Sequence, residues 1–325
     1  LAREVEKEWN DVTWAKWQAD LERLNVERLF YSYWFSLSLA GTSSSFEKFV
    51  FSQRAFEVLQ SIQKTQKKRE DFSVKAYLKK MNSPEDFLVF YSKFERDRAR
   101  AMKNEPHAIG SLIKPLIYSF LRKNEVSWEQ MVATGPIQVK LRKGSWTPRE
   151  HHQDLPKMVS VREMLQKSYN RPLVRLVESF GWEKMETYLN GKIPRLKTPL
   201  QEFPAQILGS VELTLQEIVD IYGEFFTRHC IGEDANLKLI ECLEDPKNTT
   251  LSGVVNEDMK KMRFFGKTGT TNDGLDNWFL FFDGNIYGVI WFGQEGNRED
   301  QKFRTFGATT AFRIYQAFFA ERGKQ

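Results

Sequence analysis

The 325-residue chain has only two cysteines, Cys230 and Cys242, and only four histidines. Two thiols cannot build a disulfide framework or a four-thiolate zinc site. The chain also lacks a long hydrophobic run, since its longest aromatic-rich apolar stretch, residues 29–39, falls well short of the roughly 20 residues that span a bilayer. The sequence therefore excludes a disulfide-stapled scaffold and contains neither a recognisable transmembrane segment nor a signal peptide.

The chain also has little excess of charge of either sign. The 48 basic and 43 acidic residues leave a net charge of +5, whereas nucleic-acid binding normally needs a clustered basic surface. Apolar residues make up 41% and charged residues 28%, which is typical of a globular protein. Phenylalanine is unusually common at 26 residues, so we expect an aromatic core and no nucleic-acid partner.

The first hundred residues read mostly as helix. Apolar residues recur at three- and four-residue spacing over residues 14–24, and Ser83 followed by Pro84 is a typical helix start. We therefore expect a helix over residues 83–104. Residues 29–39 are the exception, because three serines fall on one alternating face and predict a strand.

The last sixty residues have a different pattern. Three strand-like runs are followed by a helical one, and a tight turn signal at Asp283-Gly284-Asn285 separates the second run from the third. The sequence predicts strands over 263–271, 275–283 and 286–294 and a closing helix over 308–320. Together with the helices before them, these runs predict an α+β fold with an antiparallel sheet flanked by helices.

One short segment contains a nucleophile and a base. Ser111 and Lys114 are three residues apart, so at the start of a helix they lie on one face. A serine hydroxyl needs a neighbouring base to become a nucleophile, and a buried lysine with a lowered pKa can supply it. The helix start also offers backbone N–H groups to a developing oxyanion. The alternative is a surface serine and a surface lysine, because this pair alone is common by chance.

Two further motifs favour the catalytic interpretation. Ser168 and Asn170 follow a predicted helix over 161–167, and the segment 267–270 reads Lys-Thr-Gly-Thr on a predicted strand. Ser-x-x-Lys, Ser-x-Asn and Lys-Thr-Gly, in this order, form the signature of penicillin-interacting serine enzymes. From about residue 100 onward the chain resembles the transpeptidase domain of class A penicillin-binding proteins, over the segments 110–118, 145–148, 161–172, 208–214 and 266–278.

The resemblance implies a role for five catalytic residues. Ser111 would be the acylated nucleophile, and Lys114 would be the base for acylation. Ser168 and Asn170 would pass protons and hold the substrate amide, while Lys267 would lower the barrier electrostatically. How the work of the base is divided between the two lysines and Ser168 stays open at this point.

The resemblance also implies the substrate-binding residues. Thr268, Gly269 and Thr270 would bind the carboxylate end of a substrate or of a β-lactam. The backbone N–H groups of Ser111 and Thr270 would form the oxyanion hole. No metal and no organic cofactor is implied, because serine, lysine and backbone amides supply all the groups needed.

The implied activity is that of a peptidoglycan D,D-transpeptidase inhibited by β-lactam antibiotics. The alternatives are a D,D-carboxypeptidase, or a sensor or inactive scaffold with the same fold. Expected partners are peptidoglycan stem peptides and a separate glycosyltransferase or other wall-synthesis proteins. The expected location is the periplasm or the outer face of the bacterial inner membrane. Leu1 in place of Met predicts a processed piece, with membrane association through a segment outside this chain.

The chain departs from the family pattern in three ways. Residues 1–100 carry no glycosyltransferase signature, so we expect a mostly helical region there and the transpeptidase domain over 101–325. The pair of strands that usually precedes the nucleophile is hard to find. The stretch 230–266 is shorter than its counterpart in the family, which predicts a rebuilt edge of the sheet or rim of the site.

Other motifs have less specific interpretations. Residues 186–190 match a β-lactamase pattern for activating water, but they follow Ser168 too closely, and a packing helix is the better prediction. His151 and His152 are predicted to lie in a loop, since adjacent side chains point apart and no third ligand stands at metal spacing. The two cysteines are expected in the core. The basic run 64–69 fits a solvated helix face, or contact with an anionic membrane or wall polymer.

Overall fold

The computed structural model describes residues 34–37, 57–62, 72–82, 86–91, 105–231, 239–271, 274–294 and 305–322. The helical stripe predicted over 14–24 and the basic run at 64–69 lie outside the described residues. Among the described residues, no helix combines the length and the apolar character that crossing a bilayer requires.

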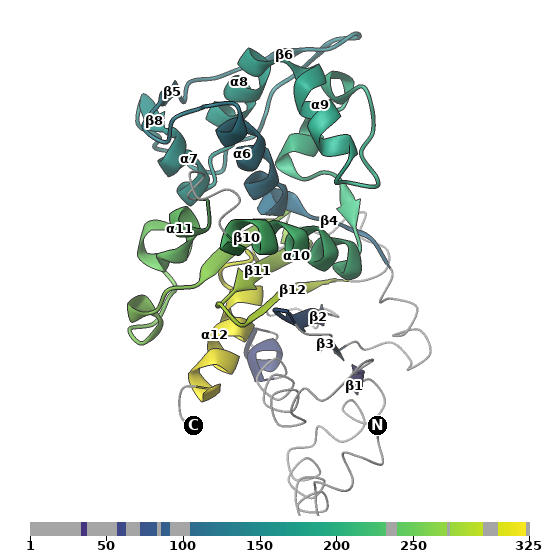
Figure 1. The fold of residues 1–325 in the computed structure, drawn as a ribbon, viewed down its shortest axis with the longest axis vertical. Helices are drawn as coiled ribbons and strands as arrows, with labels where there is room; N and C mark the ends of the chain where they lie inside the picture. Colours follow the sequence, from purple (N-terminus) through teal and green to yellow (C-terminus); the bar gives the residue numbers. More distant parts are fainter. Residues whose placement is uncertain are drawn as a thin grey trace, which may run out of the picture.

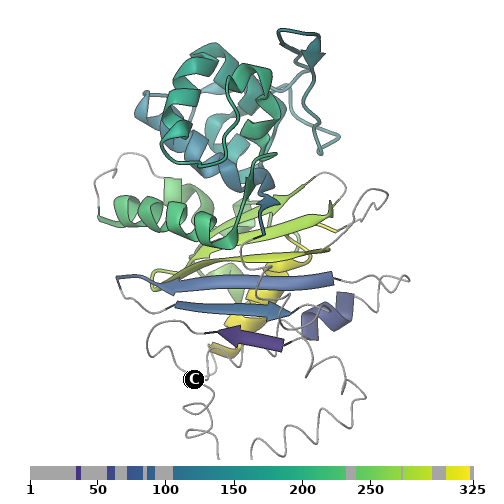
Figure 2. The ribbon, with the colours of Figure 1, turned by 90° about the vertical axis from the view of Figure 1, so that its right-hand side faces the viewer.

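A six-stranded antiparallel sheet forms the base of the molecule (Figure 2). Its order is β1 (Trp34–Leu37), β3 (Asp86–Tyr91), β2 (Phe72–Lys80), β12 (Ile286–Gln294), β11 (Asp276–Phe282) and β10 (Phe265–Thr270). The three strands predicted near the C-terminus are confirmed as β10, β11 and β12, and β1 lies within the predicted strand 29–39. The predicted turn joins β11 to β12, with Gly284 in the left-handed region at φ +95°.

The helix predicted over 83–104 is wrong for the residues that the structure describes there, because 86–91 form strand β3. The Ser-Pro start signal is overridden by pairing on both sides, since β3 lies between β2 and β1. The strand pair that the sequence seemed to lack is β2 with β3. Lys75, Lys79 and Lys80 made β2 hard to recognise in the sequence, yet Lys75 is only 1% exposed in this strand.

The described parts of the first hundred residues contain more strand than helix, because β1, β2 and β3 lie there. A mostly helical character for the region as a whole stays a prediction. Strands from both sides of residue 100 share one sheet, since β2 pairs with β12 from Phe72↔Gln294 to Lys80↔Ile286. The division of the whole chain at residue 100 stays a prediction.

Helices cover both faces of the sheet (Figure 1). The closing helix α12 (Ala311–Arg322) confirms the one predicted over 308–320, and its Phe312 and Tyr315 pack against Phe279 and Phe281 of β11. On the opposite face, α10 (Leu215–Ile231) packs through Phe226 against Phe282. Alternate residues of one strand thus serve two cores, as the two-residue period of a strand requires.

A helical lobe lies at the β10 end of the sheet (Figures 1 and 2). Its helices are α6 (Lys114–Lys123), α7 (Val161–Lys167), α8 (Arg171–Phe180), α9 (Trp182–Asn190) and α11 (Leu239–Glu244). Its 3-10 turns are η1 (Gly110–Ile113), η2 (Leu200–Glu202) and η3 (Pro204–Leu208). Two further turns, η4 (Pro246–Asn248) and η5 (Met259–Lys261), lie between α11 and β10 in the chain, and Met259 belongs to the core on the α12 face of the sheet. Its two-stranded ladders pair β4 (His107–Ala108) with β9 (Glu212–Leu213), β5 (Met131–Ala133) with β8 (Met158–Ser160), and β6 (Val139–Lys140) with β7 (Ser145–Trp146). The predicted α+β fold class is confirmed.

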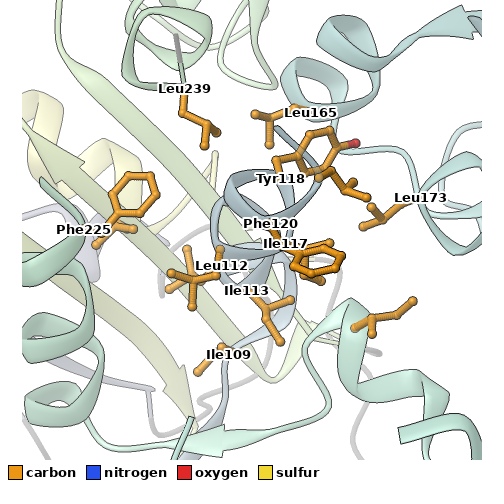
Figure 3. Close-up of a cluster of buried hydrophobic side chains, with 14 of the residues drawn as sticks. Ile109, Leu112, Ile113, Ile117, Tyr118, Phe120, Leu165, Leu173, Phe225 and Leu239 are labelled. Atoms are coloured by element: carbon orange, nitrogen blue, oxygen red, sulfur yellow. The ribbon is translucent and has the colours of Figure 1, made fainter. Parts of the chain in front are cut away.

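Helix α6 is the centre of the larger core. Residues 114–121 are all buried, so this helix is covered on every side, which is the signature of a core helix. Figure 3 shows Ile117, Tyr118 and Phe120 of α6 among side chains from α7, α8 and α10. Tight packing therefore fixes the position of the side chains at the N-terminus of α6.

Two glycines set the entry to α6. Gly110 and Gly209 both have positive φ angles, +53° and +94°. A Cβ on Gly209 would lie 1.8 Å from the Gly110 carbonyl oxygen, because the two backbones are in direct contact. The Gly110 N–H donates to the Gly209 carbonyl at 2.9 Å, and the Ile109 N–H donates to the Val211 carbonyl at 3.1 Å. Only glycine allows this approach.

Replacing Gly209 with alanine is expected to destabilise the fold by about 2 kcal/mol or more, since the new methyl group must displace backbone and occupies an unfavourable φ. Thermal unfolding of Gly209→Ala should show a Tm several degrees below that of the wild type. The matched control is Gly253→Ala, where the new Cβ meets nothing within 4 Å. Equal Tm values for the two variants would contradict the assigned contact.

Candidate active site

The three predicted motifs come from three separate elements and meet at one place. Ser111 lies in η1, where it is half-buried, and Lys114 is the first residue of α6. Ser168 is the residue that ends α7, and Lys267 lies in the middle of β10. The Ser111 hydroxyl has no hydrogen bond to another residue in the described part of the chain.

Lys114 is completely buried and points at the second motif. Its Nζ donates to the Asn170 Oδ1 at 2.7 Å and to the Ser168 Oγ at 3.2 Å. The backbone carbonyls of Ser168 and Tyr169 also accept from it, at 2.5 and 3.2 Å. Four oxygens thus surround an amine that water does not reach, which fixes its position at the helix start.

Lys267 approaches the same hydroxyl from the sheet. Its side chain is 2% exposed, and its Nζ donates to the Ser168 Oγ at 3.0 Å and to the Thr268 carbonyl at 2.9 Å. The Ser168 hydroxyl therefore lies between two lysine amines. The backbone of Ser168 is left-handed, with φ +62°, and this helix-ending conformation lets its carbonyl as well as its hydroxyl reach Lys114.

Burial controls the protonation of both lysines. Loss of hydration lowers the pKa of Lys114 to about 7, while the negative charge of Glu150 acts in the opposite direction. Loss of hydration also lowers the pKa of Lys267 well below its usual value, and the positive charge of Lys114 adds to that shift. At neutral pH a large fraction of Lys114 is a neutral amine, which is the form that can accept a proton.

The third motif lies on β10, which packs against the nucleophile segment η1. The Thr270 hydroxyl accepts from the Gly307 N–H at 3.0 Å, and the Thr268 hydroxyl is 2.9 Å from that of Thr250. A Cβ on Gly269 would lie 2.6 Å from the Ile109 carbonyl oxygen, so β10 touches the nucleophile segment backbone to backbone.

Thr270 is similarly close to the residue before the nucleophile. A Cβ on Gly110 would lie 2.7 Å from the Thr270 carbonyl oxygen. The structure therefore brings the backbones of Ser111 and Thr270, the expected oxyanion donors, onto adjoining segments.

Glu150 is a site residue that the sequence did not reveal. Its Oε2 accepts from the Asn170 N–H at 2.8 Å and from the Arg171 N–H at 3.1 Å, so this carboxylate occupies the N-terminus of α8. The preceding Arg149 carbonyl accepts from the Asn170 Nδ2 at 2.8 Å, which orients the Asn170 oxygen that Lys114 binds. No sequence signal could identify Glu150, because it lies twenty residues before the helix that it caps.

The less specific interpretations are tested by the same geometry. Glu186 lies in α9, a packing helix as predicted, and its carboxylate accepts from the Leu200 N–H. His151 and His152 lie in an exposed loop, where the ring of His152 packs edge-on against Tyr169. Within the described ranges, no cluster of three metal-ligating side chains occurs. Cys242 is a buried core residue, and burial raises the pKa of its thiol to about 12; the side chain of Cys230 is not among those described.

The sequence is similar to known penicillin-binding proteins. It is 26% identical over 253 residues to penicillin-binding protein 1B of Vibrio cholerae, which covers 67% of this chain and 32% of that protein. It is 25% identical over 292 residues to penicillin-binding protein 1B of Escherichia coli, which covers 75% of this chain and 34% of that protein. The chain thus spans about a third of the length of these curated relatives. No family model matches it.

Solved structures show the same fold. The crystal structure of penicillin-binding protein 1A from Haemophilus influenzae superposes with a TM-score of 0.64 at 16% identity, covering 77% of this chain and 48% of that one. The structure of PonA1 from Mycobacterium tuberculosis in complex with penicillin V gives 0.63 at 12% identity, covering 94% and 91%. Both the predicted resemblance to class A penicillin-binding proteins and the predicted fold are confirmed.

Replacing Glu150 with glutamine should lower the pKa of Lys114 below its value of about 7, because the lost negative charge had favoured the ammonium form. A shift of roughly 0.5–1 unit is expected from one nearby charge. NMR titration of the lysine Cε signals, assigned with Lys114→Met, measures this shift. The control Glu129→Gln removes an exposed carboxylate paired with Arg162 and should leave Lys114 unchanged. An unchanged titration in Glu150→Gln would disprove the assigned coupling.

Proposed function

We propose that this chain, whose sequence and fold resemble those of the transpeptidase-type domain of class A penicillin-binding proteins, is a peptidoglycan D,D-transpeptidase that works through a serine acyl-enzyme. One observation supports the proposal above all others. The Ser168 hydroxyl lies 3.2 Å from the Lys114 Nζ and 3.0 Å from the Lys267 Nζ. The proposed base, Lys114, and a proton carrier are thereby in contact, and Lys114 itself lies one helical turn after the proposed nucleophile, Ser111.

Acylation begins with attack of the Ser111 Oγ on the penultimate D-alanine carbonyl of a stem peptide. Neutral Lys114 accepts the Ser111 proton, directly or through the Ser168 hydroxyl. The negative charge that develops on the carbonyl oxygen is held by the backbone N–H groups of Ser111 and Thr270. The peptide C–N bond then breaks, the terminal D-alanine nitrogen takes the proton back, and the stem peptide is left as an ester on Ser111.

The carboxylate of the leaving D-alanine binds on β10. The hydroxyls of Thr268 and Thr270 donate to it, and the positive charge of Lys267 attracts it when that amine is protonated. The Gly307 N–H occupies an acceptor site of the Thr270 oxygen, so the Thr270 hydrogen is directed elsewhere and can meet a ligand.

Cross-linking follows when an amine of a neighbouring stem peptide attacks the ester. The amine loses a proton to the same base, the C–O bond to Ser111 breaks, and the serine recovers its proton. Water in place of the amine makes the reaction a D,D-carboxypeptidase reaction. A β-lactam opens on Ser111 by the same acylation, but its leaving nitrogen stays attached and blocks the acceptor.

The substrate also determines the proposed location. Peptidoglycan is cross-linked outside the cytoplasmic membrane, so the domain acts in the periplasm or on the outer face of the inner membrane. A membrane anchor outside this chain and a separate glycosyltransferase or other wall-synthesis partner complete the proposal.

Incubation with benzylpenicillin should add the mass of one penicilloyl group to the wild type and none to Ser111→Ala. Intact-mass spectrometry measures the adduct, and peptide mapping should locate it on Ser111. The control Ser119→Ala removes a hydroxyl from the far side of α6 and should acylate normally. A folded wild type without an adduct would reject the acyl-enzyme mechanism and leave an inactive scaffold.

Turnover separates the remaining alternatives. A transpeptidase or carboxypeptidase releases D-alanine from a pentapeptide stem continuously, and an added acceptor amine should convert part of the product into cross-linked dimer. A single acylation without D-alanine release would identify a sensor instead.

Lys114→Met should reduce the acylation rate by about 10² or more, since loss of a general base typically costs 10²–10⁴. The wild-type rate should rise with pH through about 7, because acylation needs neutral Lys114. The matched control is Lys123→Met, which removes an exposed lysine at the other end of the same helix. Stopped-flow acylation kinetics between pH 5 and 9 measure both effects, and wild-type rates in Lys114→Met would exclude it as the base.

A further inference from the structure

A second group of buried titratable side chains lies close to the candidate site, and the proposed chemistry does not use it. Lys75 of β2, His107 of β4 and Asp276 of β11 are between 1% and 3% exposed. The Lys75 Nζ is 3.1 Å from the His107 Nε2, and the His107 Nδ1 is 3.3 Å from the Asp276 Oδ1. Buried polar and charged groups are costly unless they are paired, so an arrangement of three titratable side chains in the core needs a reason.

The aromatic side chains around this group fix its geometry. Trp291 of β12 stacks on the His107 ring, with centroids 4.3 Å apart, and its Nε1 donates to the Asp276 Oδ1 at 3.0 Å. The Lys75 ammonium lies 4.7 Å above the same indole. With the lysine donating to Nε2, the His107 hydrogen is on Nδ1 and points at Asp276.

Asp276 connects the two segments that carry the expected oxyanion donors. Through Oδ1 it holds His107, which begins the short strand β4 that leads into Ser111. Through Oδ2 it accepts from the Thr271 hydroxyl at 3.2 Å, directly after Thr270. Its own N–H donates back to the Thr271 Oγ1 at 3.0 Å, and its carbonyl accepts the Thr271 N–H at 3.0 Å.

Neighbouring contacts point the same way. Trp278, two residues along β11, donates from its Nε1 to the Ala108 carbonyl at 2.9 Å. Strand β11 therefore contacts the segment before the nucleophile through Asp276 and Trp278. Asp276 is also hydrogen-bonded to Thr271, directly after the end of β10.

We propose that Asp276 and His107 are positioning residues that hold the backbones of Ser111 and Thr270 at the separation an oxyanion requires. The inference rests on the proposed acyl-transfer function. Neither side chain contacts the reacting atoms, so both act through the segments they join. Preorganised donors stabilise a transition state only when their positions are fixed before the reaction.

Asp276→Asn and His107→Gln should therefore slow acylation by benzylpenicillin at least 10-fold. A glutamine amide can occupy the place of Nε2 and keep the Lys75 contact, but it loses the contact with Asp276. His107→Asn places an amide near Nδ1, so it should restore acylation to within about threefold of the wild type. Thr271→Val removes the hydrogen bond to the Asp276 Oδ2 and the one that the Thr271 Oγ1 accepts from the Asp276 N–H, while the Thr271 N–H keeps its bond to the Asp276 carbonyl, so it tests the same link with a milder change.

Two further measurements separate positioning from general destabilisation. Affinity for a boronic acid that forms a tetrahedral adduct with Ser111 should fall in parallel with the acylation rate, because that adduct also needs the oxyanion hole. Non-covalent binding of benzylpenicillin to the same variants in a Ser111→Ala background should be unchanged. Leu189→Ala, a cavity in the core of α9, should lower the Tm without slowing acylation.

The outcomes are distinct. Folded variants that acylate and bind the boronic acid like the wild type would overturn the inference and leave the proposed function intact. Equal losses in non-covalent binding and in acylation would also overturn it. A wild type that does not acylate would overturn the proposed function, and the inference with it.

Discussion

The site depends on the burial of two lysine amines within about 3 Å of one hydroxyl. Burial penalises the ammonium form of each lysine, and the positive charge of Lys114 penalises that of Lys267. Deprotonation of either lysine therefore lowers the electrostatic cost at both. The fold opposes this cost with the oxygens around Lys114 and with the carboxylate of Glu150. The resulting balance lies near neutral pH, where a base must be able both to take and to return a proton.

Much of the fold could be predicted because its signals are local. Strands β11 and β12 have mostly apolar runs separated by the turn residues 283–285, and α7 begins and ends where the sequence predicted it. The three motifs were identified from residue type and order, without knowledge of their distances. Only the resemblance to a family predicted that the three motifs meet, because spacing along the chain does not give distances in space.

The features that were missed are those that depend on distant partners. Strand β2 has lysines at positions where a buried strand usually has apolar residues. Its Lys75 is accommodated by a hydrogen bond to His107 and by the indole ring of Trp291. Strand β3 begins with a helix start signal, which pairing with β1 and β2 overrides. Glu150 caps a helix twenty residues away, and Asp276 serves two segments at once. Each of these residues has an ordinary local context, so only the folded chain shows its purpose.

The order of strands in the sheet has a consequence for the making of the protein. Strand β2 pairs with β12, some two hundred residues later, and the whole helical lobe is synthesised between them. Closure of so long a loop is slow, since long-range pairing must overcome its entropy before any contact forms. During that interval β2 presents an open strand edge, which is a template for wrong pairing between chains. The lysines that made β2 hard to recognise in the sequence would also keep its unpaired edge from aggregating during that interval.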